Sequence, residues 1–212
     1  MKTLLFTGDS ITDAGRSRDV EFLSGSSYAT LAASEVCFEH PGEFRIYNRG
    51  VSGNRIVDLY ARLKVDLINL RPDYLSILIG VNDVWHELAW RNGVAADKFE
   101  RVYDMLLGEV RAELPETKIL ILEPFVLPGT ATKSENDPAA WRCFSAEVPL
   151  RAAAARRVAE KHGATFVPLQ KKLDEALERA ESSYWLVDGV HPNFAGNELI
   201  KREWIAAFNR IL

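Results

Sequence analysis

Five short runs of β-forming residues alternate along the chain with longer helical patterns, and this alternation limits the possible folds more than any other feature. The runs span residues 3–7, 44–48, 74–79, 118–123 and 164–167. Largely continuous apolar runs are typical of strands in a parallel sheet that is covered on both faces. The sequence therefore predicts a doubly wound α/β layer structure.

Helical patterns fill the segments between these runs. They cover residues 56–70, 99–110 and 151–162 and the segment that follows Asn193. A proline or a glycine ends each of the first three, and Asn193 is a suitable N-terminal cap for the last. The sequence shows no internal repeat and no low-complexity linker, so we expect a single domain over residues 1–212.

Composition argues against several classes of protein. The net charge is −4 and basic residues do not cluster, which argues against a nucleic-acid partner. No stretch approaches the roughly 20 apolar residues of a membrane span, and the first apolar run reaches Gly8 too early for a signal-peptide core. We therefore expect a cytoplasmic protein that does not insert into a membrane, with Cys37 and Cys143 as free thiols.

Three polar clusters directly follow predicted strands, and a fourth precedes the last helix. They are Gly8-Asp9-Ser10, residues 48–55 (NRGVSGNR), residues 80–83 (GVND) and residues 188–192 (DGVHP). In open α/β sheets, ligands bind at the carboxyl ends of the strands. We therefore expect all four clusters to meet at one edge of the sheet.

Ser10 lies where a strand turns into a helix, so its hydroxyl is either a helix N-terminal cap or a nucleophile. A nucleophilic serine needs a base. His191 follows Asp188 by three positions in a turn that Gly189 permits. Such a carboxylate can hold the imidazole in one tautomer, although Asp188 also suits an ordinary Asx turn in a surface loop.

The other three histidines are weaker candidates for the base. His86 could line the site but lacks an obvious carboxylate to orient it, and His162 falls near a helix end where we expect it to be solvated. His40 lies in a loop with no acidic neighbour beyond Glu39.

Attack of a serine on an ester carbonyl creates an oxyanion, which needs hydrogen-bond donors already in place. Gly53 can offer a backbone N–H at close range, and Asn82 can offer its side-chain amide. Each residue also suits an ordinary turn after a strand. The meeting of four clusters with complementary roles nevertheless favours a hydrolytic site.

Other chemistries fit the residues less well. Asp9 lacks the second aspartate that accompanies a phosphoryl-accepting aspartate. The chain has neither of the glycine-rich nucleotide-binding motifs, no HExxH motif and no Cys/His cluster with zinc spacing. We therefore expect neither a cofactor nor a metal.

Taken together, the four blocks resemble the pattern of the SGNH (GDSL) hydrolases over nearly the whole chain. The matching residues are Gly8-Asp9-Ser10, Gly53, Gly80-Val81-Asn82-Asp83 and Asp188-x-x-His191. The resemblance implies a flavodoxin-like three-layer α/β/α fold with five parallel strands. It further implies Ser10 as nucleophile, His191 as base, Asp188 as its orienting partner, and an oxyanion hole made by Ser10 N–H, Gly53 N–H and the Asn82 amide.

Longer phrases, such as EPFVLP and DGVHPN, are similar to a bacterial subgroup that includes acetylxylan esterases acting on short acetylated xylo-oligosaccharides. We expect an ester substrate of this kind. Aromatic rings near the site, those of Trp85, Trp141, Tyr184 and Trp185, could then bind sugar faces. We take the three tryptophans, with Asp9 and Asp83, as candidate substrate contacts. The same tryptophans could instead be core or subunit-contact residues.

Two alternative functions remain open at this point. One is a lysophospholipase- or thioesterase-type hydrolase of longer acyl chains. The other is a non-catalytic carbohydrate- or lipid-binding module, although such a module has no need to keep Ser10, Asp188 and His191 together. The long connection at residues 124–140 could act as a lid or as a subunit contact in a homo-oligomer.

Overall fold

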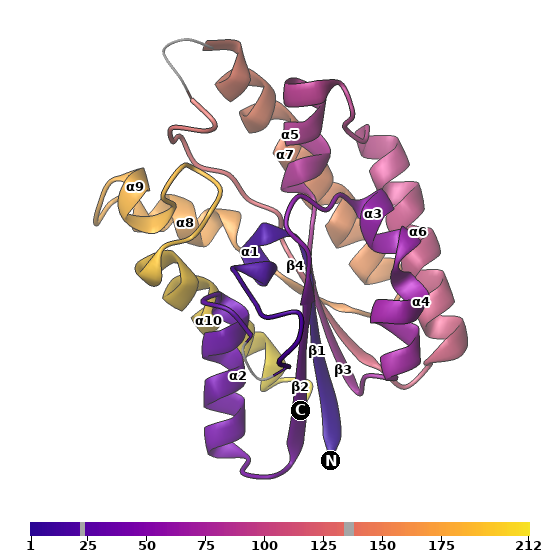
Figure 1. Cartoon of the computed structure of the whole chain (residues 1–212). Coiled ribbons are helices and arrows are strands. Elements are labelled where there is room, and N and C mark those ends of the chain that lie inside the picture. Colours follow the sequence, from indigo (N-terminus) through magenta and orange to yellow (C-terminus); the bar gives the residue numbers. More distant parts are fainter. Residues whose placement is uncertain (22–23, 134–137) are drawn as a thin grey trace.

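A five-stranded parallel sheet with helices on both faces forms the protein (Figure 1). The computed structural model describes residues 1–21, 24–133 and 138–212. The strands are β1 (Lys2–Gly8), β2 (Phe44–Gly50), β3 (Tyr74–Leu78), β4 (Lys118–Leu122) and β5 (Thr165–Val167), in the spatial order β2-β1-β3-β4-β5. All five predicted strands and the three-layer α/β class are confirmed.

Two helical layers enclose the sheet (Figure 1). The helices are α1 (Ser10–Asp13), α2 (Tyr28–Glu39), α3 (Ile56–Ala61), α4 (Leu63–Asp66), the 3-10 turn η1 (Ile68–Leu70), α5 (Val81–Trp90), α6 (Ala96–Glu113), α7 (Pro138–Lys161), α8 (Gln170–Ala176), α9 (Ser182–Trp185) and α10 (Phe194–Phe208). α2 and α10 pack on one face of the sheet, and α3, α4, α6 and most of α7 cover the other.

Alternation within each strand divides the apolar side chains between two cores. In β1, Leu4 and Phe6 face α2 and α10, whereas Leu5 faces the opposite layer. Successive side chains of a strand point to opposite faces of the sheet, so a strand covered on both faces has to be apolar throughout. This explains why the strands were visible as apolar runs.

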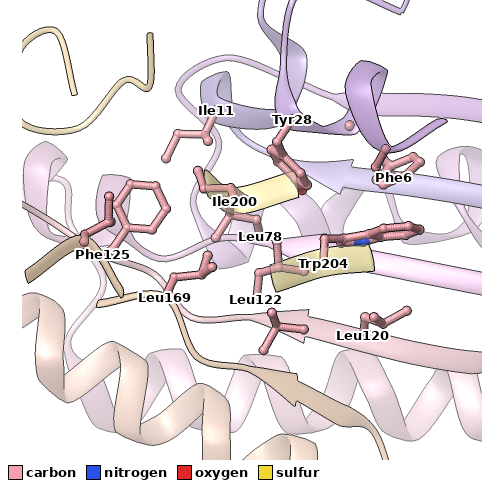
Figure 2. Close-up of a cluster of buried hydrophobic side chains, with 14 of the residues drawn as sticks. Phe6, Ile11, Tyr28, Leu78, Leu120, Leu122, Phe125, Leu169, Ile200 and Trp204 are labelled. Atoms are coloured by element: carbon pink, nitrogen blue, oxygen red, sulfur yellow. The ribbon is translucent and has the colours of Figure 1, made fainter. Parts of the chain in front are cut away.

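We call the core between the sheet and helices α2 and α10 the first core, and Trp204 of α10 lies at its centre (Figure 2). Its indole is fully buried, stacks on Phe208 with ring centroids 4.7 Å apart, and lies 5.1 Å from the Phe6 ring. The indole N–H donates to Ser76 Oγ on β3 at 2.9 Å. The last helix is thereby attached to the middle of the sheet.

The helix predicted over residues 56–70 is interrupted in the structure. It divides at Arg62 and again at Leu67 into α3, α4 and η1. The Arg62 guanidinium donates to the carbonyl oxygens of Arg49 at 2.7 Å and Gly8 at 3.1 Å. These bonds hold Arg62 against the ends of β1 and β2, in a backbone conformation that ends the first helical turns.

The predicted helix at 151–162 begins much earlier, at Pro138, and includes Pro149. Proline is rare inside a helix because it removes a hydrogen bond. For this reason the sequence analysis placed the start of the helix after Pro149. Residues 124–133 form the connection, and residues 134–137 lie outside the described part of the chain. The sequence analysis also missed α2, α5 and α8.

Trp204→Ala should lower the free energy of unfolding by about 3–5 kcal/mol, because it leaves a large cavity in the core. Trp204→Phe retains most of the ring but leaves Ser76 Oγ without this donor, so its loss should be smaller, about 1–3 kcal/mol. The matched control is Trp90→Ala, since Trp90 is 67% exposed. Urea unfolding of the three variants measures the effect, and equal losses for Trp204→Ala and Trp90→Ala would contradict this account.

Candidate active site

Ser10, His191 and Asp188 form a continuous hydrogen-bonded chain at the carboxyl edge of the sheet. Ser10 Oγ lies 2.8 Å from His191 Nε2, and His191 Nδ1 lies 2.8 Å from Asp188 Oδ2. An ionised carboxylate only accepts hydrogen bonds. Nδ1 therefore carries the proton in the neutral imidazole, and Nε2 is left to accept from the serine hydroxyl.

The structure shows that Ser10 is not the N-terminal cap of α1. The N-terminal cap of α1 is Asp9, whose Oδ1 accepts from Ile11 N–H at 3.0 Å, and Ser10 is the first residue of the helix. The Ser10 hydroxyl is therefore not needed as a cap. It instead faces His191, which lies 181 positions later in the chain.

Both interpretations of Asp188 hold at once, one for each carboxylate oxygen. Oδ1 closes an Asx turn by accepting from the N–H groups of Val190 and His191, both at 2.9 Å. Oδ2 accepts from the imidazole. Gly189 has a φ of +98°, which a side chain would strain, and permits this turn. The turn thus aims the carboxylate and the imidazole at the same point.

The hydrogen bonds between Asp188 and His191 shift the pKa values of both residues. Partial burial raises the pKa of Asp188, but the hydrogen bonds from His191 and Val190 outweigh it and lower that pKa to about 2. The hydrogen bond to Asp188 raises the pKa of His191 above its usual value, against the opposing effect of burial. A histidine with a raised pKa is a stronger acceptor for the serine proton.

Gly53 and Asn82 come to the same edge from two different strands. Gly53 has a φ of +80° in the turn after β2, and that turn begins with Val51 N–H donating to Gly8 O at 3.0 Å. Asn82, in the first turn of α5, donates from Nδ2 to Asn54 O at 3.2 Å. Both predicted oxyanion donors therefore lie on segments bonded to one another and to the end of β1.

Asp13 also helps to build the site, and the sequence analysis missed it. Its Oδ2 accepts from both Ser52 N–H and Ser52 Oγ at 2.9 Å, and Arg18 pairs with it at 2.7 Å. These bonds attach α1 to the turn that carries Gly53. No local pattern reveals the pairing, because Asp13 and Ser52 are 39 residues apart.

Asp9 and Asp83 lie beneath the site rather than open to it, since their exposed fractions are 1% and 0%. Burial raises the pKa of Asp9 to about 7, even though Ile11 N–H opposes this shift. Burial likewise raises the pKa of Asp83, whose two oxygens both lie 3.2 Å from Ile56 N. This burial favours a supporting role over direct contact with substrate.

The three tryptophans singled out from the sequence occupy different environments. Trp85 lies beside the catalytic candidate His191, with ring centroids 5.9 Å apart. Trp141 is partly buried against the first core. Trp185 is only 5% exposed and its indole donates to Ala180 O. Trp185 is thus a core residue, which is the alternative that the sequence left open.

The remaining histidines have partners other than the serine hydroxyl, and His86 Nε2 lies close to Gly53. His162 is not solvated as expected: its Nε2 lies 2.7 Å from Asp104 Oδ1 and its side chain is 13% exposed. His40 lies 3.9 Å from Glu43. His86 packs against Trp90 on α5. Of the four, His191 is the one hydrogen-bonded to Ser10.

No group of three or more histidine, cysteine, aspartate or glutamate side chains is placed to hold a metal ion within residues 1–21, 24–133 and 138–212. In the same part of the chain, no helix has the length and apolar character needed to cross a bilayer.

Asp9→Asn tests the burial of the carboxyl group, because the amide keeps an oxygen that can accept from Ile11 N–H. The folded-state pKa is about 7 and the reference value is 3.8. The folded protein therefore holds a proton that the unfolded chain has released, and stability from this group is lost as the pH rises through that range. Relative to wild type, the free energy of unfolding of Asp9→Asn should rise by roughly 4 kcal/mol between about pH 4 and pH 8.

Denaturant unfolding at several pH values measures this difference. The matched control is Asp19→Asn, since Asp19 is exposed on the segment that follows α1. A difference between Asp9→Asn and wild type that stays constant with pH would contradict the assignment.

Comparison with known proteins agrees with the geometry. The chain matches the GDSL-like lipase/acylhydrolase family over residues 6–199. An acetylxylan esterase of Geobacillus stearothermophilus is 31% identical over 212 residues, which cover 95% of this chain and 91% of the esterase.

Solved structures lead to the same family. A GDSL-like protein of Parabacteroides merdae has a TM-score of 0.90 and 35% identity, covering 98% of this chain and 95% of its own. Axe2, the acetylxylan esterase of Geobacillus stearothermophilus, has a TM-score of 0.82 and 30% identity, covering 97% and 93%. The chain therefore belongs to the GDSL-like lipase/acylhydrolase family and is a serine ester hydrolase.

Proposed function

We propose that this esterase removes short acyl groups, above all acetyl, from carbohydrate esters such as acetylated xylo-oligosaccharides, with Ser10 as nucleophile. The observation that carries the chemistry is the 2.8 Å contact between Ser10 Oγ and His191 Nε2, backed by the 2.8 Å contact between His191 Nδ1 and Asp188. The acetyl preference is supported by the likeness to an acetylxylan esterase at 31% identity.

The proposed reaction has two steps. In the first, His191 Nε2 takes the Ser10 proton as Oγ attacks the ester carbonyl, and the alcohol then leaves with that proton. In the second, His191 takes a proton from water as the water attacks the acyl-enzyme carbonyl, and it returns that proton to Ser10 Oγ as the bond to Oγ breaks and the acid is released. The N–H groups of Ser10 and Gly53 and the Asn82 amide stabilise the oxyanion of each tetrahedral intermediate.

The solved structures of Axe2 support these roles. Three of them are catalytic mutants, in which a serine, an aspartate and a histidine are each replaced by alanine. The aspartate precedes the histidine by three positions there, and Asp188 precedes His191 by three positions here. The same three residue types thus occur with the same spacing near the end of the chain.

The experiment that tests the proposed substrate is hydrolysis of nitrophenyl esters from acetyl to decanoyl, together with acetylated xylobiose. We expect the acetyl ester to be cleaved fastest and Ser10→Ala to lose activity on every substrate. Faster cleavage of the decanoyl ester would favour the longer-chain hydrolase instead. Full activity of Ser10→Ala would remove Ser10 from the chemistry.

Asn82→Ala tests the oxyanion donor separately from the nucleophile. Loss of one such donor costs roughly 10²–10³ in kcat, so this variant should be slow but measurable on nitrophenyl acetate. The matched control is Asn209→Ala, an exposed asparagine at the end of α10. An Asn82→Ala variant with the kcat of wild type would show that the amide does not hold the oxyanion.

A further inference from the structure

The imidazole of His191 belongs to the loop between α9 and α10, outside any helix or strand. Its side chain is 38% exposed. Two hydrogen bonds hold the ring, one from Nδ1 to Asp188 and one from the Ser10 hydroxyl to Nε2, each 2.8 Å long. Side chains that reach solvent change rotamer rapidly, so the position of this ring depends on every contact that restrains it.

The hydrogen bond at Nε2 exists for only part of the proposed reaction. In the free enzyme, the Ser10 hydroxyl supplies the proton that Nε2 accepts. In the acyl-enzyme, Ser10 Oγ carries the acyl group and no proton, and the neutral Nε2 has no proton to donate. Among the described residues, Asp188 alone then holds the imidazole by a hydrogen bond, at the moment when Nε2 has to accept a proton from water.

Trp85 supplies a contact with this imidazole that acylation of Ser10 does not remove. The two ring centroids are 5.9 Å apart and the ring planes are tilted by 50°, a separation at which aromatic rings attract one another. Trp85 also meets Phe144 of α7 edge to face at 5.9 Å, and Phe144 is fully buried. Trp85 therefore connects the ring of His191 to the first core.

The start of α5 is fixed by neighbouring segments, which gives Trp85 a firm base. Asp83 O accepts from Val94 N–H at 2.9 Å, and Val94 O accepts from the buried guanidinium of Arg151 at 2.6 Å. α7, which carries Arg151 and Phe144, lies beside α5 (Figure 1). A side chain supported in this way can resist displacement of the ring that lies against it.

We propose that Trp85 is a positioning residue that keeps the His191 imidazole within reach of the acyl-enzyme, so that deacylation depends on it more than acylation does. This inference rests on the proposed two-step reaction at Ser10 and assigns Trp85 a part in its second step. Trp85 acts through His191 rather than on the substrate. The sequence also allowed a substrate contact or a core or subunit-contact residue, and these roles predict other kinetic results.

The two steps can be separated with one ester. With nitrophenyl acetate, nitrophenol leaves on acylation and acetate leaves on deacylation, so kcat/KM reports binding and acylation only. In the steady state, kcat equals the deacylation rate constant multiplied by the acetylated fraction of the protein. Intact-protein mass spectrometry after an acid quench measures that fraction, and the two quantities together give the deacylation rate constant.

In Trp85→Ala, the deacylation rate constant should fall about three- to tenfold, the effect of losing one aromatic contact. The acetylated fraction should rise, because the acyl-enzyme lasts longer. The value of kcat/KM should change by less than about twofold, since the Ser10 hydroxyl still holds the imidazole during acylation. Trp85→Phe keeps an aromatic ring and should recover most of the deacylation rate.

The matched control is Trp90→Ala, which removes the same type of side chain from the same helix. Trp90 is 67% exposed and its ring contacts His86, so this variant should keep both kcat/KM and the deacylation rate constant. Trp85→Leu keeps an apolar side chain against Phe144 and decides the question if Trp85→Ala does not fold. Its deacylation rate constant should also fall, about two- to fivefold, because it has no ring to place against the imidazole.

Three outcomes would overturn the proposal. A loss confined to kcat/KM would make Trp85 a substrate contact, and equal losses in kcat/KM and deacylation would make it a core residue. Wild-type values of both in folded Trp85→Ala or Trp85→Leu would leave it no part in the reaction.

Failure of the proposed function gives a different result. A Ser10→Ala variant that still becomes acetylated and turns over would remove Ser10 as the nucleophile, whatever the Trp85 variants do. If Ser10→Ala is neither acetylated nor active while Trp85→Ala deacylates as fast as wild type, the proposed nucleophile stands and only the role of Trp85 fails.

Discussion

The 2.8 Å contact between Ser10 Oγ and His191 Nε2 joins residues 181 positions apart, and the rest of the site depends on it. A parallel sheet makes the contact possible because the carboxyl ends of its strands meet at one edge. β1 delivers Ser10 to that edge. The loop before α10 delivers His191, and the bond from Trp204 to Ser76 attaches α10 to the centre of the sheet. The core is thus also the support of the site.

Building the site at this edge places carboxyl groups where water does not reach. Asp9 and Asp83 are both almost fully buried, and burial raises the pKa of each. A buried carboxyl group lowers stability when it ionises. Burial of the apolar side chains in the two cores offsets this loss of stability. The loss arises at Asp9, the neighbour of Ser10, and at Asp83. Asp13, which is bonded to the turn that carries Gly53, shows the opposite balance, since Arg18 and Ser52 satisfy its carboxylate.

In the proposed reaction, the two sides of the ester meet different segments of the chain. Gly53 and Asn82 come from the turn after β2 and the start of α5, and the proposal assigns them to the carbonyl oxygen. The loop before α10 carries His191 and its partner Asp188, and the proposal assigns this pair to proton transfer with the alcohol.

The sequence by itself determined the five strands, the carboxyl-edge clusters and the pairing of Asp188 with His191. These features are local, because backbone preference and burial periodicity act over a few neighbouring residues. The break at Arg62, the bond from Asp13 to Ser52 and the early start of α7 at Pro138 were decided only by the tertiary structure. So were the burial of Trp185 and the exposure of Phe194. Each depends on contacts between segments far apart in the chain, which arise only when the layers pack around the sheet.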